Sequence, residues 1–542
     1  MKVSKSWQIL VFDGQLWVNL ELRSFPSMPD SLLRRLTATG GPFITTLDVA
    51  GHVHITAATL LRMTNNLCLT SPPQSASFPY TQLTAVNLQG CPSLTTRSLH
   101  HLLVRSRSLQ ILCVKGLRAV TNTTCDILSA YNPQLVSLDM SRCSNMDAEG
   151  IQNLAAAAIS RGEHLQLKVL RLCGLKATDD RMMTTLGKAA PYLEVLDLNY
   201  ARQLHNTGLD AFVACEDEAE ERQRLGVETI YVSARDLGRD SGNATKLRRR
   251  VTRLRHLSIS SCIMLTDDAC SNLAYSVPRL EFFEMAGIGS DLKDDGLVRL
   301  LNTTPFIRRI DLEDAPEVSD ALLATLTPPA SRSLLEHAEP TPGHALEQLN
   351  ISYATQVSDE ALLGLVRGCP RLMNLEVDNT RVGGTVLTEF VRLNRKRKTV
   401  DAKMVAVDCR NVSASLIQDL SASIRPRKGW RAHEARKLMY LDGKDGIFDE
   451  LKVGQDECDE RRVVLKSFYS WQTVDAVKAA REKRRKSLRR GANESASDVN
   501  DGGSSSGRST RWWSPGGRRS PRSGSDSPPN MIEMSNDGCT VM

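Results

Sequence analysis

Acidic side chains recur along this sequence at a fixed place relative to a short apolar pattern, and they are its first candidates for chemistry. Each lies within or just after a segment of the form L-x-x-L-x-L, where a strand is expected. Carboxylates in such a row could act in catalysis or bind positive charge on a partner. The acids in question are Asp139, Asp197, Glu284, Asp311, Glu313, Glu376 and Asp378.

No catalytic signature accompanies these acids in the sequence. There is no phosphate-binding P-loop, no G-x-S-x-G nucleophile elbow and no H-E-x-x-H zinc motif. The 13 cysteines include no C-x-x-C pair, which disfavours a zinc ribbon or a disulfide scaffold and fits a reducing compartment. We therefore predict a protein that is not an enzyme and that uses no metal and no cofactor.

The elements that carry the acids come from an internal repeat. The spacings between successive copies of L-x-x-L-x-L include five of 26 residues. Because one such unit cannot bury its own apolar face, the copies are expected to stack. The ten clear copies begin at Leu83, Leu109, Leu135, Leu167, Leu193, Leu254, Leu280, Ile307, Leu346 and Leu372.

Each unit reads as a short strand followed by a turn and a helix. Alternating apolar residues bury one face of the strand, and a small residue such as Cys91, Cys143 or Cys262 follows. Free cysteines are usually buried, so we interpret these as spacers, with a redox or metal role as the alternative. Pairs such as Ser319-Asp320 and Ser358-Asp359 are typical of helix N-caps.

The unit resembles the cysteine-containing class of leucine-rich repeats, whose pattern is L-x-x-L-x-L-x-x-C-x-x-[LIV]-[TS]-D. The resemblance covers residues 83–394. It implies an α/β fold, a leucine-rich-repeat solenoid curved as a right-handed superhelix, with strands on the concave side and helices outside. A degraded copy at Phe43 precedes the set.

The first residues resemble the second half of an F-box, in which a V-x-K-x-W helix precedes an L-W-x-x-L-x-L ending. This order, F-box then repeats, resembles substrate receptors of SCF-type cullin–RING ubiquitin ligases. The resemblance implies an adaptor and a cullin as partners, a client held by the solenoid, and ubiquitin-dependent proteasomal degradation. The adaptor-binding residues it implies are Val3, Lys5, Trp7, Leu10, Leu16 and Trp17.

This F-box resemblance departs from the family pattern because the first helix, usually opened by Leu-Pro-x-Glu, is not found. We expect that helix to be encoded upstream of Met1, the alternative being that adaptor docking has been lost. A further interpretation is that residues 1–24 cap the open end of the solenoid, since an uncapped end exposes apolar surface.

The concave face is predicted from the third, fifth and seventh residues of each L-x-x-L-x-L-x segment. Across the ten copies these positions hold seven acids and three bases, and five of the acids belong to the last four copies. We therefore predict that this face binds a basic protein client and no nucleic acid, because phosphates would be repelled. A merely solvated strand face is the alternative.

The sequence divides into five predicted regions. They are a partial F-box (1–24), a linker with a degenerate repeat (25–82), the repeats (83–394), a C-terminal cap (395–480) and a disordered basic tail (481–542). An insertion at 216–253 begins acidic and ends basic. It is interpreted as a tolerated surface insertion or as a regulatory or client-gripping loop.

The positive charge is concentrated near the C-terminus. Residues 478–522 hold 13 Lys and Arg against 4 Asp and Glu, whereas the whole chain has 69 against 62. The sequence ends Cys539-Thr540-Val541-Met542, a C-a-a-X pattern for farnesylation at Cys539. With the basic segment as a second signal, we predict a cytoplasmic protein on an anionic membrane surface, with the nucleus as the alternative location.

Two functions follow from these observations. The first is a substrate-recognition subunit of an SCF-type ubiquitin ligase, monomeric within its complex and tethered to membrane. The alternative is a leucine-rich-repeat scaffold or small-GTPase regulator that has no link to a ubiquitin ligase.

Overall fold

The computed structural model describes residues 13–69, 79–216, 227–239, 246–329, 341–424 and 461–467. The chain divides into two compact units, Met1–Lys478 and Ala479–Met542. The second unit, with the predicted basic tail and Cys539, lies outside the described residues. Within the ranges above, every helix is too short or too polar to cross a membrane.

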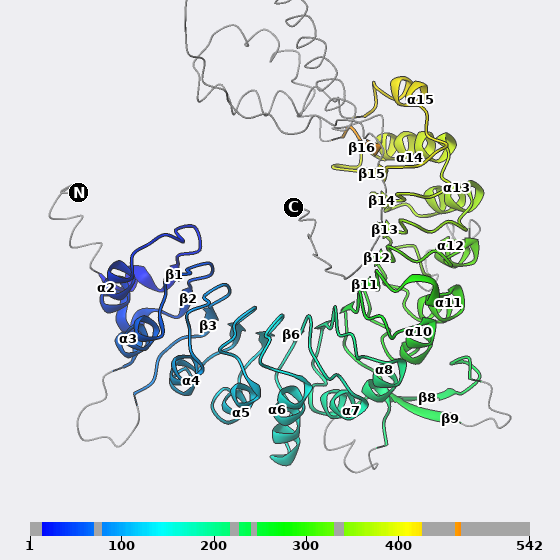
Figure 1. The fold of residues 1–542 in the computed structure, drawn as a ribbon. Coiled ribbons are helices and arrows are strands. Elements are labelled where there is room, and N and C mark those ends of the chain that lie inside the picture. Colours follow the sequence, from blue (N-terminus) through cyan, green and yellow to red (C-terminus); the bar gives the residue numbers. More distant parts are fainter. Residues whose placement is uncertain are drawn as a thin grey trace, which may run out of the picture. The chain divides into compact units, whose positions relative to one another are not determined.

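One long parallel sheet runs through the described part of the first unit. It has 14 strands in the order β1 to β7 and then β10 to β16, so neighbours in the sheet are also neighbours among the repeats. Figure 1 shows the strands along the inner side of an arc. The strands are β1 (Asn19–Glu21), β2 (Thr46–Asp48), β3 (Ala85–Asn87), β4 (Ile111–Cys113), β5 (Ser137–Asp139), β6 (Val169–Arg171), β7 (Val195–Asp197), β10 (His256–Ser258), β11 (Phe282–Glu284), β12 (Arg309–Asp311), β13 (Gln348–Asn350), β14 (Asn374–Glu376), β15 (Lys403–Ala406) and β16 (Val464–Ser467).

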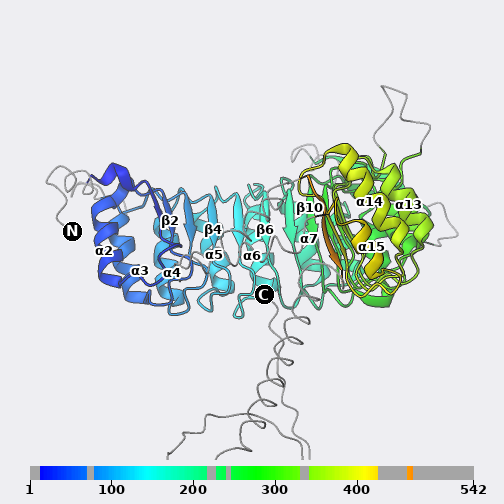
Figure 2. The same cartoon turned by 90° about the horizontal axis from the view of Figure 1, so that it is seen from above.

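Helices cover the outer side of the sheet, one after most strands, and Figure 2 shows them stacked side by side. The α-helices are α2 (Asp30–Gly40), α3 (Ala57–Leu67), α4 (Thr96–Arg105), α5 (Asn122–Tyr131), α6 (Ala148–Ser160), α7 (Asp180–Ala189), α8 (Asn206–Val213), α10 (Asp267–Leu273), α11 (Asp294–Asn302), α12 (Asp320–Leu326), α13 (Asp359–Gly368), α14 (Gly384–Arg397) and α15 (Ala414–Asp419). The 3₁₀ helices are η1 (Gly14–Trp17), η2 (Gly41–Phe43) and η3 (Gly289–Asp291). The predicted α/β repeat solenoid is thus confirmed.

The leucines of the pattern form one continuous core between sheet and helices. The fourth residue of each copy is buried, with at most 1% of its surface exposed, as in Leu112 of β4 and Leu349 of β13. The helices contribute residues spaced by three or four positions, such as Leu362, Leu365 and Val366 in α13. Each repeat therefore contributes its apolar face to a core shared with both neighbours.

The Ser-Asp pairs join neighbouring repeats as well as capping helices. Ser358 caps α13 by accepting the N–H of Ala361, and its own N–H donates to Asp320 at 2.7 Å. Asp320 is the first residue of α12, in the preceding repeat. Asp359 in turn accepts the N–H of Gly383 before α14. The serine thus caps its own helix, and the aspartate bonds the next repeat.

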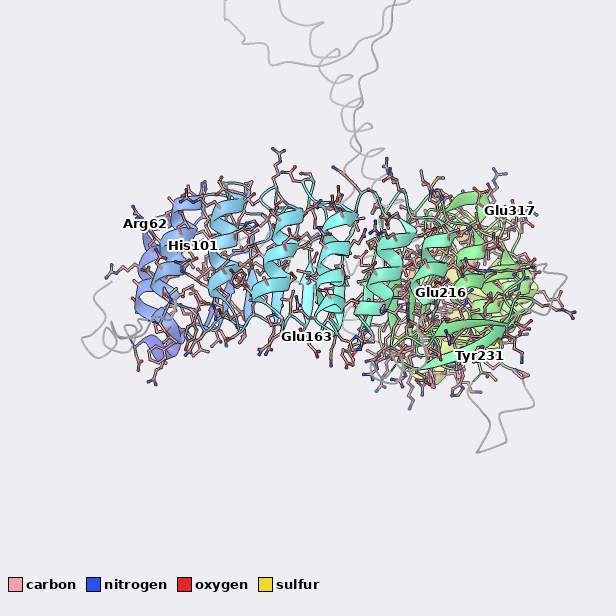
Figure 3. All side chains as sticks on the ribbon, turned by 90° about the horizontal axis from the view of Figure 1, so that it is seen from below. Arg62, His101, Glu163, Glu216, Tyr231 and Glu317 are labelled. Atoms are coloured by element: carbon pink, nitrogen blue, oxygen red, sulfur yellow. The ribbon has the colours of Figure 1, made fainter. Side chains whose placement is uncertain are left out.

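The insertion forms an antiparallel ribbon of β8 (Thr229–Ser233) and β9 (Lys246–Arg250). Figure 3 shows Tyr231 of β8 beside the helical side of the molecule. Asp210 of α8 fixes this ribbon, because it pairs with Arg239 and Arg249 at 2.5 Å each. The side chain of Arg249 is 2% exposed. Removing one partner of a buried ion pair strongly destabilises a protein, because the other charge is left unpaired. These contacts therefore anchor the described part of the insertion to α8.

The N-terminal residues that resemble an F-box ending lead directly into the sheet. Leu16 and Trp17 lie in η1, with Leu16 62% exposed and Trp17 packed against the core. Leu20 lies in β1, which pairs with β2. Val3, Lys5, Trp7 and Leu10 lie outside the described residues. The described part of this segment therefore covers the first end of the solenoid core.

Candidate protein-binding surface on the concave sheet

The acids predicted to face the concave side do so in the structure. Asp139, Asp197, Glu284, Asp311 and Glu376 each end a strand, flanking a buried residue, and are partly exposed. Glu313 and Asp378 follow two residues after the ends of β12 and β14, and Glu313 is exposed. The regular register of the parallel strands places these carboxylates in rows across the sheet.

Three residues expected to point away from the sheet are buried, which corrects that part of the prediction. Ser141, Ser258 and Ser352 are only 2–3% exposed. Their hydroxyl groups are small enough to lie between neighbouring turns. Ser352, for example, accepts the N–H of Asp378 from the next repeat at 3.2 Å.

The Asp or Asn at the end of a strand has a structural task that sequence reasoning missed. Its Oδ1 accepts the N–H two residues ahead, as in Asp139 to Ser141 (3.0 Å) and Asp311 to Glu313 (3.3 Å). Short polar side chains commonly stabilise turns in this way. The same bond is made by Asp48, Asn87, Asp197 and Asn350. This role explains why Asp and Asn recur at this position of the repeat.

Two of the acids are neutralised by neighbouring strands. Glu376 pairs with Lys403 of β15 at 2.5 Å. Glu284 lies 3.7 Å from His256 and 3.4 Å from Arg309, on the strands at either side. The imidazole of His256, with the Ser258 hydroxyl and Arg309, lowers the pKa of Glu284 to about 2. These two carboxylates are therefore committed to contacts within the sheet.

Three acids beside them remain available to a partner. We call Asp311, Glu313, Tyr353 and Asp378 the acid–aromatic surface. Burial raises the pKa of Asp311 and Asp378, and nearby carboxylates raise it further. Negative charges that raise each other's pKa are stabilised by an approaching cation. A cavity of about 100 Å³ adjoins them on β12 to β14, with Asp311 in its wall.

Tyr353 lies between the acids and has an unusual backbone conformation. Its φ is +70°, and its side chain is 43% exposed. Its turn follows β13, and its N–H donates to the carbonyl of Asp378 at 2.8 Å. Glu313 lies in the preceding turn, after β12. The aromatic ring is thus offered to solvent between turns that carry carboxylates.

Tyr353 shares its left-handed backbone conformation with the equivalent residue of the other clear copies. Glycine occupies this position at Gly90, Gly116, Gly174 and Gly287, and other residues occupy it at Arg142, Tyr200, Ser261, Asp314 and Asn379. A large side chain in this conformation costs on the order of 1 kcal/mol, and such strain gathers at functional sites. Tyr200, with φ +60°, is the second tyrosine of this kind. A large aromatic residue at a turn position that glycine, serine, asparagine or aspartate often fills was the sequence signal, and it was missed.

A second row of charges lies at the other end of the strands, at the second residue of each copy. Its members alternate in sign from β6 to β13: Lys168, Glu194, Arg255, Glu281, Arg308 and Glu347. Ion pairs join Lys168 to Glu194 (3.6 Å), Arg255 to Glu281 (2.7 Å) and Arg308 to Glu347 (2.8 Å). The members of this charge ladder pair with one another, and these pairs stabilise the stacking of neighbouring repeats.

The repeat cysteines lie in the core as buried thiols. The Sγ of Cys91 donates to the carbonyl of Val49, and that of Cys262 to the carbonyl of Leu198, in the preceding repeats. Burial raises the pKa of Cys91 to about 11 and that of Cys262 to about 12. Such neutral thiols are poor nucleophiles and metal ligands, as expected of spacers. Sequence reasoning missed that they also bond the repeats together.

Comparisons with known proteins find similarity to solved structures. No protein-family model matches the sequence, and no curated protein matches it significantly. Among solved structures, the Rad7 and Elc1 complex in yeast is similar at 16% identity and a TM-score of 0.41, over 76% of this chain and 92% of that chain. The TLR13–ssRNA13 complex is similar at 18% identity and a TM-score of 0.30, over 56% of this chain and 36% of that chain. Nothing about the function of this chain follows from either likeness.

Proposed function

We propose that this chain is a non-catalytic receptor for a protein partner, and that its acid–aromatic surface binds a Lys- or Arg-rich segment of that partner. The observation that carries the proposal is Tyr353, exposed at a strained position between turns bearing Glu313 and Asp378. A guanidinium or ammonium group could lie over the ring while its N–H groups meet the carboxylates.

The charges around this surface favour a cation over other ligands. Glu284 and Glu376 already form ion pairs, whereas no ion pair joins Glu313 or Asp378 to a described residue. The charge of Lys403, which is paired with Glu376, only partly offsets the rise in the pKa of Asp378 that burial causes. A nucleic acid would meet repulsion from these carboxylates. Tyr and Arg are also the residues most often found at the energetic centre of protein interfaces.

We further propose that the receptor serves a cullin–RING ubiquitin ligase as its substrate-recognition subunit. The support is the order of the sequence, an F-box-like ending before cysteine-containing repeats, together with the exposed side chain of Leu16. In such a receptor, Leu16 would contact the adaptor and the concave face would hold the client. The alternative is a scaffold or small-GTPase regulator that shares the solenoid and lacks the adaptor.

Affinity capture followed by mass spectrometry tests the client surface. The baits are the full chain, Glu313→Lys and the control Gln89→Lys, which adds positive charge at the same exposed repeat position in the N-terminal half. We expect Glu313→Lys to lose basic partners that the wild type and Gln89→Lys retain. Equal capture by all three baits would remove the proposal.

The ligase link is tested separately in the same captures. We expect the cullin adaptor to co-purify with the wild type and to be lost with Leu16→Asp, while the basic partner stays bound. If the basic partner is captured and the adaptor is absent even from the wild-type capture, the scaffold alternative is correct.

The membrane tether stays a prediction from the sequence, because Cys539 lies outside the described residues. Comparing the membrane-bound fractions of wild type and Cys539→Ser tests it. We expect the substitution to move the protein to the soluble fraction, and unchanged partitioning would contradict the prediction.

A further inference from the structure

A second candidate site lies away from the concave face, where the insertion meets the repeats. It is a cavity of about 330 Å³ between the ends of α7 and α8, the chain after β9, and the loop before β11. Pockets for small molecules usually begin at about this size. Tyr192 and Phe212 contribute aromatic walls.

Basic side chains dominate the charge of this cavity. Arg250, Arg253 and Arg279 line it, and Glu228 is its one acidic lining residue among those described. Arg250 is buried, with 5% of its surface exposed, whereas Arg253 and Arg279 are exposed at the rim. Among the described lining residues, three guanidinium groups stand against one carboxylate, and an anion would offset this positive charge.

Contacts within the fold hold Arg253 in place. The guanidinium of Arg253 lies over the ring of Tyr192, 5.2 Å from its centre. Its backbone is fixed by the preceding residues, because Val251 donates to Glu228 and Thr252 donates to Ser276. This cation–π contact holds the guanidinium group beside the cavity that both residues line.

The floor of the cavity depends on the close contact of two helices. A Cβ atom at Gly187 would lie 2.1 Å from the carbonyl oxygen of Phe212 and 3.3 Å from Nη1 of Arg250. Glycine is therefore required at this crossing of α7 and α8. Both helices end here, and their partial negative charge is offset by the buried Arg250. The charges of Arg253 and Arg279 at the rim are additional to the charge of Arg250.

We infer that this cavity binds a phosphoryl group together with the small organic group that carries it. Arginine forks match the oxygens of phosphate, and charge-assisted bonds of this kind are stronger than neutral ones. The volume accommodates more than a phosphate ion, and the aromatic walls suit an attached apolar group. The phosphoryl group could belong to a free organic phosphate or to a phosphorylated side chain. This inference is independent of the proposed client surface.

Isothermal titration calorimetry on the full chain tests the site. The probes are phenyl phosphate, the peptide acetyl-Ala-Ala-phosphoserine-Ala-Ala-amide, and the same peptide without phosphate. We compare the wild type with Arg253→Ala/Arg279→Ala and with the control Arg62→Ala/Arg97→Ala, which removes two exposed arginines from α3 and α4. Arg62 is labelled in Figure 3. Thermal unfolding confirms that each variant is folded.

We expect the wild type and the control to bind at least one phosphate probe at least tenfold more tightly than the double variant does. We also expect both proteins to bind that probe at least tenfold more tightly than they bind the unphosphorylated peptide. Tighter binding of phenyl phosphate identifies a free organic phosphate as the source, and tighter binding of the phosphopeptide identifies a phosphorylated side chain. Absence of binding by both phosphate probes, or equal binding by the folded double variant, would overturn the inference.

Discussion

The two halves of the concave sheet share one scaffold and differ in what they present to solvent. Strands β2 to β6 carry residues such as Ala85, Asn87 and Ser137 on the concave face, and their turns are largely glycine. Strands β10 to β14 carry Asp311 and also Glu284, which pairs with Arg309 on the neighbouring strand. The strained Tyr353 belongs to this half, and the charge ladder runs through it after beginning at Lys168 beside β6.

This difference teaches that the residues that stabilise the repeat and the residues presented to solvent occupy separate positions of the same repeat. The fourth residue is apolar and buried in both halves, as Leu112 and Leu349 show. The exposed residues around it differ between the halves without any change in strand register. A solenoid can therefore acquire a binding surface in one region while each repeat keeps its contacts to its neighbours.

The largest expected effect is the same in both halves. Leu112→Ala in β4 and Leu349→Ala in β13 should each lower the free energy of unfolding by about 2–5 kcal/mol, because each leaves a cavity in a close-packed core. Urea denaturation measures both changes. A cost confined to one half would show that the halves do not share one scaffold.

The next effect should separate the halves. Tyr353→Ala is expected to weaken binding of the captured basic partner by about 10- to 100-fold, as for a central interface tyrosine. The stability of this variant should change less than that of a core variant, since the tyrosine is 43% exposed. Gly116→Ala, at the equivalent turn in the N-terminal half, should cost about 1 kcal/mol of stability, because its φ is +75°, and should leave binding unchanged. Surface plasmon resonance and urea denaturation provide the two readouts.

The charge ladder sharpens the comparison further. Arg308→Glu places like charges between Glu281 and Glu347 and should cost about 1 kcal/mol of stability, since these pairs are partly exposed. Adding Glu347→Arg should recover much of that loss. The effect should shrink in 1 M salt, where exposed charges are screened. A double variant as unstable as the single one would rule out an ion-pair role.

The smallest effect is a change in pH dependence. The folded pKa of Glu284 is about 2, below its ordinary value of 4.5. Its contribution to stability is therefore complete above pH 4.5 and is lost as the pH falls toward 2. Glu284→Gln should flatten the loss of stability over this range. Denaturation curves that fall in parallel for both proteins would contradict the pairing with His256 and Arg309.

The sequence predicts the scaffold well because the repeat encodes it many times. The spacing of leucines such as Leu346 and Leu349 indicated the strands, and the Ser-Asp pairs indicated the helix starts. It could not show that Asp320 bonds the cap of the next repeat, because that contact joins residues 38 positions apart. Such contacts follow from stacking geometry and not from local pattern.

The acid–aromatic surface was predicted only in part, because it too depends on contacts between residues far apart in the sequence. The row of acids was visible in the repeat, but charge alone does not tell which acids are neutralised. Lys403, which pairs with Glu376, comes from β15, where the repeat pattern is weak. The cavity beside Arg253 depends on how the insertion folds back, and an irregular segment has no periodic signal to reveal it.

The central claim is that the C-terminal half of the concave face binds a basic partner, and one affinity comparison tests it most directly. Surface plasmon resonance measures the Kd of the captured partner for the wild type, Glu313→Lys and Gln89→Lys at one salt concentration. We expect Glu313→Lys alone to weaken binding at least tenfold, because it replaces an attraction by a repulsion at the contact. Equal affinity for all three proteins, or an equal loss in both variants, would contradict the claim.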